Sequence, residues 1–218
     1  MIRFEKLPYP ILIGGHVVLT IFMIALPLLV KVFFYAILVY LLLRVFLNQD
    51  RNREVLLAGT YLCCLEVFLR MNSALPFFEM MKYLIIIFSM LGIFIKGFSL
   101  KSVPYAFFLL LLVPSIVIAA QNIPLGESLR KSVAFNLSGP VALGISAIYC
   151  YRTTITMERL DEILKFAVGP IVMITTYLFV VTPDIRDVVT DTASNFATSG
   201  GYGPNQVATA LGIGMFIC

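Results

Sequence analysis

Charged side chains interrupt two of the long apolar runs in this 218-residue chain. Glu66 and Arg70 lie four positions apart in one run. Glu79 and Lys82 lie three apart in the next, so each pair falls on one face of a helix. Ionisable groups inside apolar runs are costly and mark either structural pairing or a functional site. One interpretation is that the two pairs neutralise each other. The other is a charged pocket centred on Arg70, because a guanidinium stays charged and binds phosphate through two hydrogen bonds.

Two adjacent basic residues, Arg130 and Lys131, stand directly before another apolar run. One interpretation is that both side chains are solvated. The other is that they hold an anionic group, because the start of a helix offers free N–H groups and a favourable dipole to an anion. Ser138, Gly139 and Pro140 follow in the same run. Proline removes a backbone hydrogen bond, so the pattern predicts an interrupted helix, and broken helices at membrane depth line enclosed cavities.

A polar segment places Arg186 among Asp184, Asp187 and Asp191. The aspartates recur at helical spacing, but no histidine accompanies them, and we expect no metal site. Arg186 either pairs with Asp187 or faces a pyrophosphate while the aspartates hold it in place. The chain shows no Ser-His-Asp set and no nucleotide-binding glycine pattern, so we expect no nucleotide or other cofactor.

The segment SGGYGPNQ, residues 199–206, precedes the last apolar run. Its glycines permit positive φ angles and close backbone approach, and Pro204 suits the first turn of a helix. Asn205 and Gln206 would then present amides beside the free N–H groups of a helix start. One interpretation is a tight turn followed by a helix start. The other is a site at the membrane surface that binds a polar or anionic head group.

The elements that must position these residues are membrane-spanning helices. Hydrophobic residues make up 60% of the chain, and the mean hydropathy is +0.97, which indicates an integral membrane protein. We predict an all-α, polytopic protein in which residues 1–218 form a single transmembrane helical domain. Its seven complete spans would be Pro10–Val30, Val32–Leu47, Val55–Ala74, Pro76–Ile95, Val103–Ala120, Val133–Tyr151 and Ile163–Thr182, and an eighth would start near Pro204.

Loop charges predict the orientation, because Lys and Arg stay on the cytoplasmic side. With a cytoplasmic N-terminus, ten of the sixteen basic residues fall on that side, and Arg70, Arg130, Lys131 and Arg186 fall on or near the outer face. The amphipathic stretch Thr153–Ala167 should lie on the cytoplasmic surface and lead into the seventh span. The net charge of +4 is modest and predicts no nucleic-acid partner.

The stretch NFATSGGYGPNQVATALGIGMF, and more weakly FNLSGPVAL, resembles the O-antigen ligase and O-antigen polymerase family. The resemblance implies a protein of the bacterial inner membrane with ten to fourteen spans, of which this chain would be an N-terminal portion. Such proteins transfer a glycan from undecaprenyl pyrophosphate on the periplasmic face, without metal or cofactor. The acceptor is lipid A–core in ligases and a second lipid-linked glycan in polymerases.

The resemblance also implies roles for individual residues. Arg186 matches the first essential external arginine of the family and would be catalytic, and the other outer basic and amide residues would bind substrate: Arg70, Arg130, Lys131, Asn205 and Gln206. Family ligases use a histidine in a large external loop, whereas the single histidine here, His16, falls in the first span and is more typical of a satisfied buried side chain.

The alternative is a polytopic transporter or flippase for a polar or lipid-linked substrate, built around the intramembrane charges. Transporters of that kind show two corresponding halves, and no internal repeat is visible in this sequence. Transport would depend on the intramembrane charges, whereas glycan transfer would depend on Arg186 and the segment around Asn205.

Overall fold

The computed structural model describes residues 4–122, 129–151, 153–182 and 195–217, and within these ranges it contains helices and no strand. The all-α prediction is therefore confirmed. The main helices are α1 (Tyr9–Ala25), α2 (Leu28–Asn48), α3 (Glu54–Met71), α4 (Met80–Lys96), α5 (Val103–Leu111), α6 (Val113–Asn122), α7 (Leu129–Cys150), α8 (Met157–Val181) and α10 (Pro204–Ile217). Three short 3-10 turns accompany them: η1 (Phe4–Lys6), η2 (Leu100–Ser102) and η3 (Ala197–Ser199).

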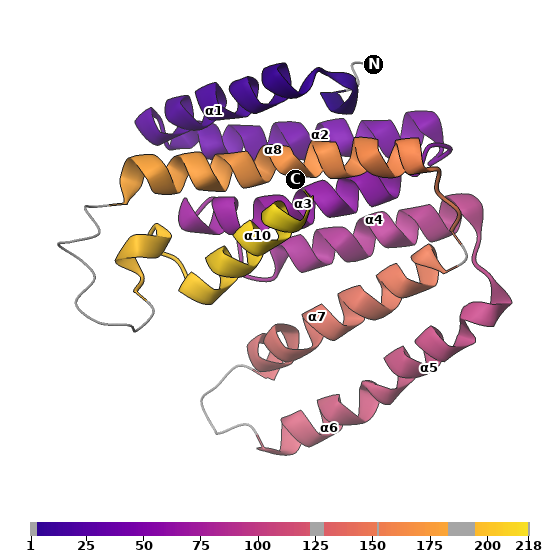
Figure 1. Ribbon diagram of the computed structural model, residues 1–218. Helices are drawn as coiled ribbons and strands as arrows, with labels where there is room; N and C mark the ends of the chain where they lie inside the picture. The colour runs from indigo at the N-terminus through magenta and orange to yellow at the C-terminus, as the bar shows by residue number, and fades with distance from the viewer. Residues whose placement is uncertain (1–3, 123–128, 152, 183–194, 218) are drawn as a thin grey trace.

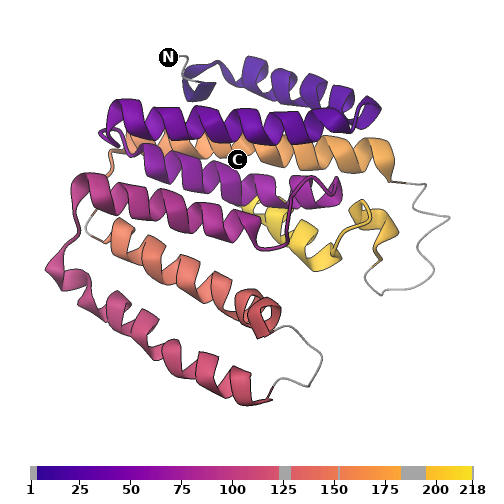
Figure 2. The ribbon, with the colours of Figure 1, turned by 180° about the vertical axis from the view of Figure 1, so that it is seen from behind.

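Helix α8 forms the centre of the bundle. It packs against α1, α3 and α10, while α7 joins α4 to α5 and α6 at the outer edge (Figures 1 and 2). Half of the α8 span is buried inside the protein, against 6% of the edge span Leu100–Ile118. The aromatic rings of Tyr61 on α3 and Phe166 on α8 stack with centroids 4.2 Å apart, and both side chains are buried. The core thus forms where α8 meets α3.

Glycine allows α1 to approach α8 closely. Gly169 lies against the imidazole of His16, and a Cβ atom at this position would overlap the ring. Nδ1 of His16 is 2.7 Å from the Leu12 carbonyl oxygen, and its Nε2 lies 3.3 Å from the Tyr61 hydroxyl. The histidine is hydrogen-bonded at both nitrogens, as we expect for a structural residue.

Four helical segments among the described residues are long and apolar enough to cross a membrane: Leu28–Asn48, Leu100–Ile118, Val133–Cys150 and Met157–Val181. The seven predicted complete spans are therefore confirmed only in part. Helices α1 and α4 are apolar but have 17 residues each, which is the lower limit of the length that crosses a membrane. Helix α3 has 18 residues but carries three charged side chains, Glu54, Glu66 and Arg70, and it is not among these four segments.

The sequence indicates a break between the first two spans at Pro27 and Lys31. The structure places it at Pro27 alone, because α1 ends at Ala25 and α2 begins at Leu28 and includes Lys31. The interruption predicted at Pro140 is wrong, since α7 continues through it from Leu129 to Cys150. Helix α7 is held between α4 on one side and α5 and α6 on the other, and this packing maintains the helix despite the missing backbone donor.

The predicted span Val103–Ala120 instead consists of two helices, α5 and α6, which meet at Leu112. The amphipathic stretch Thr153–Ala167 leads into the seventh predicted span, because from Met157 onward it forms the first turns of α8. Met157 is exposed there, whereas Arg159 is buried with 9% exposure. The hydroxyl of Thr156 caps this helix by accepting the Arg159 N–H at 3.2 Å.

Candidate functional site

A groove of about 410 Å³ lies between the C-terminal half of α3 and the start of α10. It joins three of the residues predicted to bind substrate, Arg70, Asn205 and Gln206. Its lining consists of Cys63, Glu66, Val67, Arg70, Tyr202, Asn205, Gln206, Thr209, Ala210 and Ile213. The polar residues come from both helices, and Val67, Ala210 and Ile213 add an apolar wall. The groove therefore offers polar and apolar contacts side by side.

The guanidinium of Arg70 is fixed before any ligand arrives. Its Nε donates to Oε1 of Glu66 at 2.9 Å, and its Nη2 donates to the same carboxylate and to the Phe78 carbonyl oxygen. Its Cζ lies 3.6 Å from the centroid of the Phe78 ring, and the side chain is 7% exposed. Nη1 makes no hydrogen bond to any described residue. Because the other nitrogens are held, Nη1 is the donor that remains for a ligand.

The turn before α10 brings the amides to this arginine. Gly200 and Gly201 have φ of 67° and 76°, as the glycine pattern predicts. The carbonyl oxygen of Gly203 accepts the first helical hydrogen bonds, which come from the N–H groups of Gln206 and Val207 at 3.1 and 3.2 Å. Asn205 and Gln206 are exposed in the first turn of α10. The predicted helix start at Pro204 is therefore confirmed.

The charges of α4 do not neutralise those of α3. Glu66 pairs with Arg70 of its own helix, whereas Nζ of Lys82 lies 5.9 Å from the ring centroids of both Phe78 and Phe135. The mutual neutralisation suggested by the spacing is absent among the described residues, where Glu79 occupies the N-cap position of α4 and its side chain forms neither a capping hydrogen bond nor an ion pair. The ring of Phe78 lies within cation–π range of both cations.

Of the other three predicted site residues, the structure describes the side chain of Lys131 only. Lys131 is exposed in the first turn of α7, one helical turn before Phe135, whose ring lies 5.7 Å from that of Phe78. Arg130 belongs to the same helical turn, and its side chain lies outside the described part of the structure. The predicted catalytic residue Arg186 lies outside the described residues, as do the three aspartates around it.

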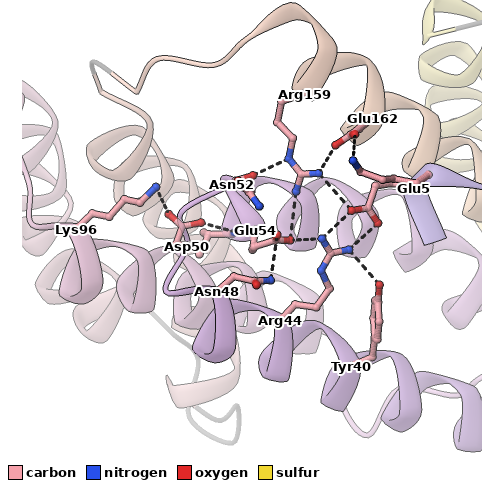
Figure 3. Close-up of polar contacts among 12 residues, drawn as sticks. Glu5, Tyr40, Arg44, Asn48, Asp50, Asn52, Glu54, Lys96, Arg159 and Glu162 are labelled. Atoms are coloured by element: carbon pink, nitrogen blue, oxygen red, sulfur yellow. Dashed lines mark hydrogen bonds and ion pairs between the residues drawn. The ribbon is translucent and has the colours of Figure 1, made fainter. Parts of the chain in front are cut away.

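A second polar cluster occupies the opposite end of the bundle, and the sequence analysis did not anticipate it. Glu5, Arg44, Glu54 and Arg159 form a closed ring of alternating charge (Figure 3). Arg44 binds both oxygens of Glu5 at 2.6 and 2.7 Å and Oε2 of Glu54 at 2.6 Å. Arg159 closes the ring with distances of 3.4 Å to Glu5 and 3.2 Å to Glu54.

The four side chains of this ring come from η1, α2, α3 and α8, and none is more than 10% exposed. Buried charges require partners, and here each carboxylate has two guanidiniums. Burial alone would raise the pKa of Glu5, but its hydrogen bonds with Arg44 and the nearby charges of Arg44 and Arg159 hold the pKa below its ordinary value of 4.5. The ring thus ties the N-terminal segment to three helices.

Arg44 and Arg159 are among the ten basic residues expected on the cytoplasmic side. The structure shows that both are buried and paired with carboxylates. The available signal was Arg44 itself, which stands within the apolar run of α2. An unpaired charge in such a run requires a partner elsewhere in the chain.

Together the apolar helices and the two polar ends define an all-helical membrane protein. The chain matches no protein-family model, no curated protein and no solved structure. Within the described ranges, no group of three or more His, Cys, Asp or Glu side chains could hold a metal ion. The groove around Arg70 is the candidate functional site because it combines a fixed cation, exposed amides and an apolar wall.

Proposed function

We propose that the protein is a membrane glycan transferase of the O-antigen ligase or polymerase type, which uses an undecaprenyl-pyrophosphate-linked donor in the bacterial inner membrane. The observation that carries the proposal is the groove, which joins Arg70 to Asn205 and Gln206 across two helices. Arg70 is far in the sequence from the adjacent pair Asn205 and Gln206, and all three side chains can donate hydrogen bonds to phosphate oxygens.

The chemistry requires stabilisation of a leaving group. Breaking the bond between the sugar and the pyrophosphate increases the negative charge on the lipid pyrophosphate as the acceptor hydroxyl attacks the sugar. Arg70 is already oriented by Glu66 and Phe78, so it can stabilise this charge through Nη1 without a conformational change. The amides of Asn205 and Gln206 provide further donors, and Arg186 is proposed to supply the catalytic positive charge.

The apolar wall suits the rest of the donor. Val67 and Ala210 are buried beside the polar residues, while Ile213 is 45% exposed and continues the apolar surface along α10. A polyprenyl chain requires such a surface, because it lies in the hydrocarbon while its pyrophosphate stays at the polar boundary. The groove would then face the periplasm, and the charge ring would mark the cytoplasmic end.

Deletion of the gene tests this function. Surface glycan and the undecaprenyl-linked pool are compared on gels. Long glycan missing from the surface but accumulating on undecaprenyl identifies a ligase, and single repeats in both pools identify a polymerase. Normal profiles in both pools contradict glycan transfer of this polymer and favour the transporter.

A further inference from the structure

A second cavity, separate from the Arg70 groove, opens at the end of the bundle that carries the charge ring. Its volume is about 540 Å³. Its lining includes Arg53, Lys96, Phe98, Ser99 and Tyr149. We propose that this cavity binds a phosphate group, carried by an anionic membrane lipid or present as free phosphate. The inference does not depend on the proposed glycan transfer.

Arg53 provides the first donor. It adopts a left-handed backbone conformation with φ of 57° immediately before α3, which turns the chain sharply at the cavity. Its Nε donates to the carbonyl oxygen of Thr154 at 3.1 Å, and this contact ties the start of α3 to the segment before α8. Its two Nη atoms make no hydrogen bond to any residue in the described ranges. The terminal nitrogens can therefore bind two phosphate oxygens.

Lys96 provides the second cation. It ends α4, and its Nζ lies 3.1 Å from Oδ2 of Asp50, a carboxylate that is fully buried. The same carboxylate accepts the Tyr149 hydroxyl at 2.8 Å and the Val55 N–H at 2.9 Å. Asp50 compensates one of the two cations that line the cavity. One positive charge is left over, and a phosphate group would balance it.

The surroundings of the cavity match the boundary of a membrane. Phe98 lines the cavity and is 61% exposed, and Leu100 just beyond it is 79% exposed. Cations beside exposed apolar side chains, where helices end, suit a lipid whose phosphate binds in the cavity and whose chains follow the apolar residues. Arg53 and Arg70 flank opposite ends of the 18-residue helix α3, about 26 Å apart by the helical rise, so the two sites cannot share one phosphate.

The test uses the full chain, purified in detergent. Native mass spectrometry measures bound phosphatidylglycerol, with phosphatidylcholine as the zwitterionic comparison, and thermal unfolding is followed with and without inorganic phosphate. Arg53→Gln removes the proposed donor. Arg51→Gln is the matched control, because Arg51 is exposed two residues earlier and does not line this cavity.

We expect phosphatidylglycerol binding to weaken about tenfold in Arg53→Gln and to stay unchanged in Arg51→Gln, because the lost bonds are charge-assisted. If phosphate alone stabilises the wild type but not Arg53→Gln, the proposal holds with free phosphate as the source. Equal effects of the two substitutions, or no binding of either probe, would overturn it.

A second variant covers the case in which Arg53→Gln does not fold. Ser99→Asp adds a negative charge to the cavity lining, and Ser99→Asn is its neutral control of similar shape. Binding of the same probe should weaken about tenfold in the aspartate variant only, because the new carboxylate repels phosphate. Equal binding by the two Ser99 variants would show that no phosphate occupies this cavity.

Discussion

Removal of Glu54 from the charge ring should destabilise the protein strongly. Glu54 is fully buried and binds Arg44 at 2.6 Å and Arg159 at 3.2 Å. Glu54→Gln leaves these two guanidiniums to share one remaining buried carboxylate, that of Glu5. Loss of one member of a buried ionic pair costs about 3–5 kcal/mol. For a chain of this size each kcal/mol lowers the unfolding temperature by about 2–4 °C, so we expect a fall of about 6–20 °C.

The matched control is Glu162→Gln. Glu162 also binds Arg159, at 2.7 Å, but 26% of its side chain is exposed, so its loss should cost no more than about 1 kcal/mol. The assay follows thermal unfolding in one detergent by the loss of helical circular dichroism. Similar small shifts for both variants would refute the reasoning that burial makes the ring strong.

Three further predictions concern stability. The pKa of Glu5 is held below its ordinary value of 4.5, so its charged form stabilises the fold above about pH 4.5, and this contribution is lost as the pH falls through the lower folded-state value. Acid unfolding should therefore be steeper in wild type than in Glu5→Gln; equal profiles would contradict the coupling. Gly200→Ala should lower the free energy of unfolding by about 1–2 kcal/mol, because φ at this position is 67°. Gly212→Ala should raise it by up to about 1 kcal/mol, because no atom lies within 4 Å of the added Cβ. Shifts of the unfolding temperature in the same direction for both variants would contradict this. Gly169→Ala should lower the unfolding temperature because its Cβ overlaps His16, and adding His16→Ala should restore part of the loss; purely additive effects in a double-mutant cycle would argue against the contact.

Local patterns predicted the helices and some of their pairings well. The apolar runs located most of the main helices approximately, although one run contains both α5 and α6. The spacing placed Glu66 and Arg70 on one helical face, where they form an ion pair within α3, but the neutralisation expected between the two helices does not occur among the described residues. Pro140 misled the prediction, since a proline signals only the loss of one local bond, whereas the packing of neighbouring helices determines whether the helix continues.

The charge ring could not be predicted from local patterns. Glu5 is 39 positions from Arg44 and 154 positions from Arg159, so only the packing of η1, α2 and α8 brings them together. The groove was partly predictable, because Arg70, Asn205 and Gln206 were expected on one face of the membrane. Their common cavity arises because α10 packs against both α8 and α3, a contact that no spacing in the sequence reveals.

Complementation of the deletion strain with Gln206→Glu tests the central claim most directly. This isosteric change places a negative charge in the groove, at an exposed position where folding should tolerate it. Gln49→Glu is the control, because Gln49 is also exposed but ends α2 at the other end of the bundle. The account predicts that Gln49→Glu restores long surface glycan and that Gln206→Glu, expressed at the same level, does not. Full restoration by Gln206→Glu would contradict a pyrophosphate site in this groove.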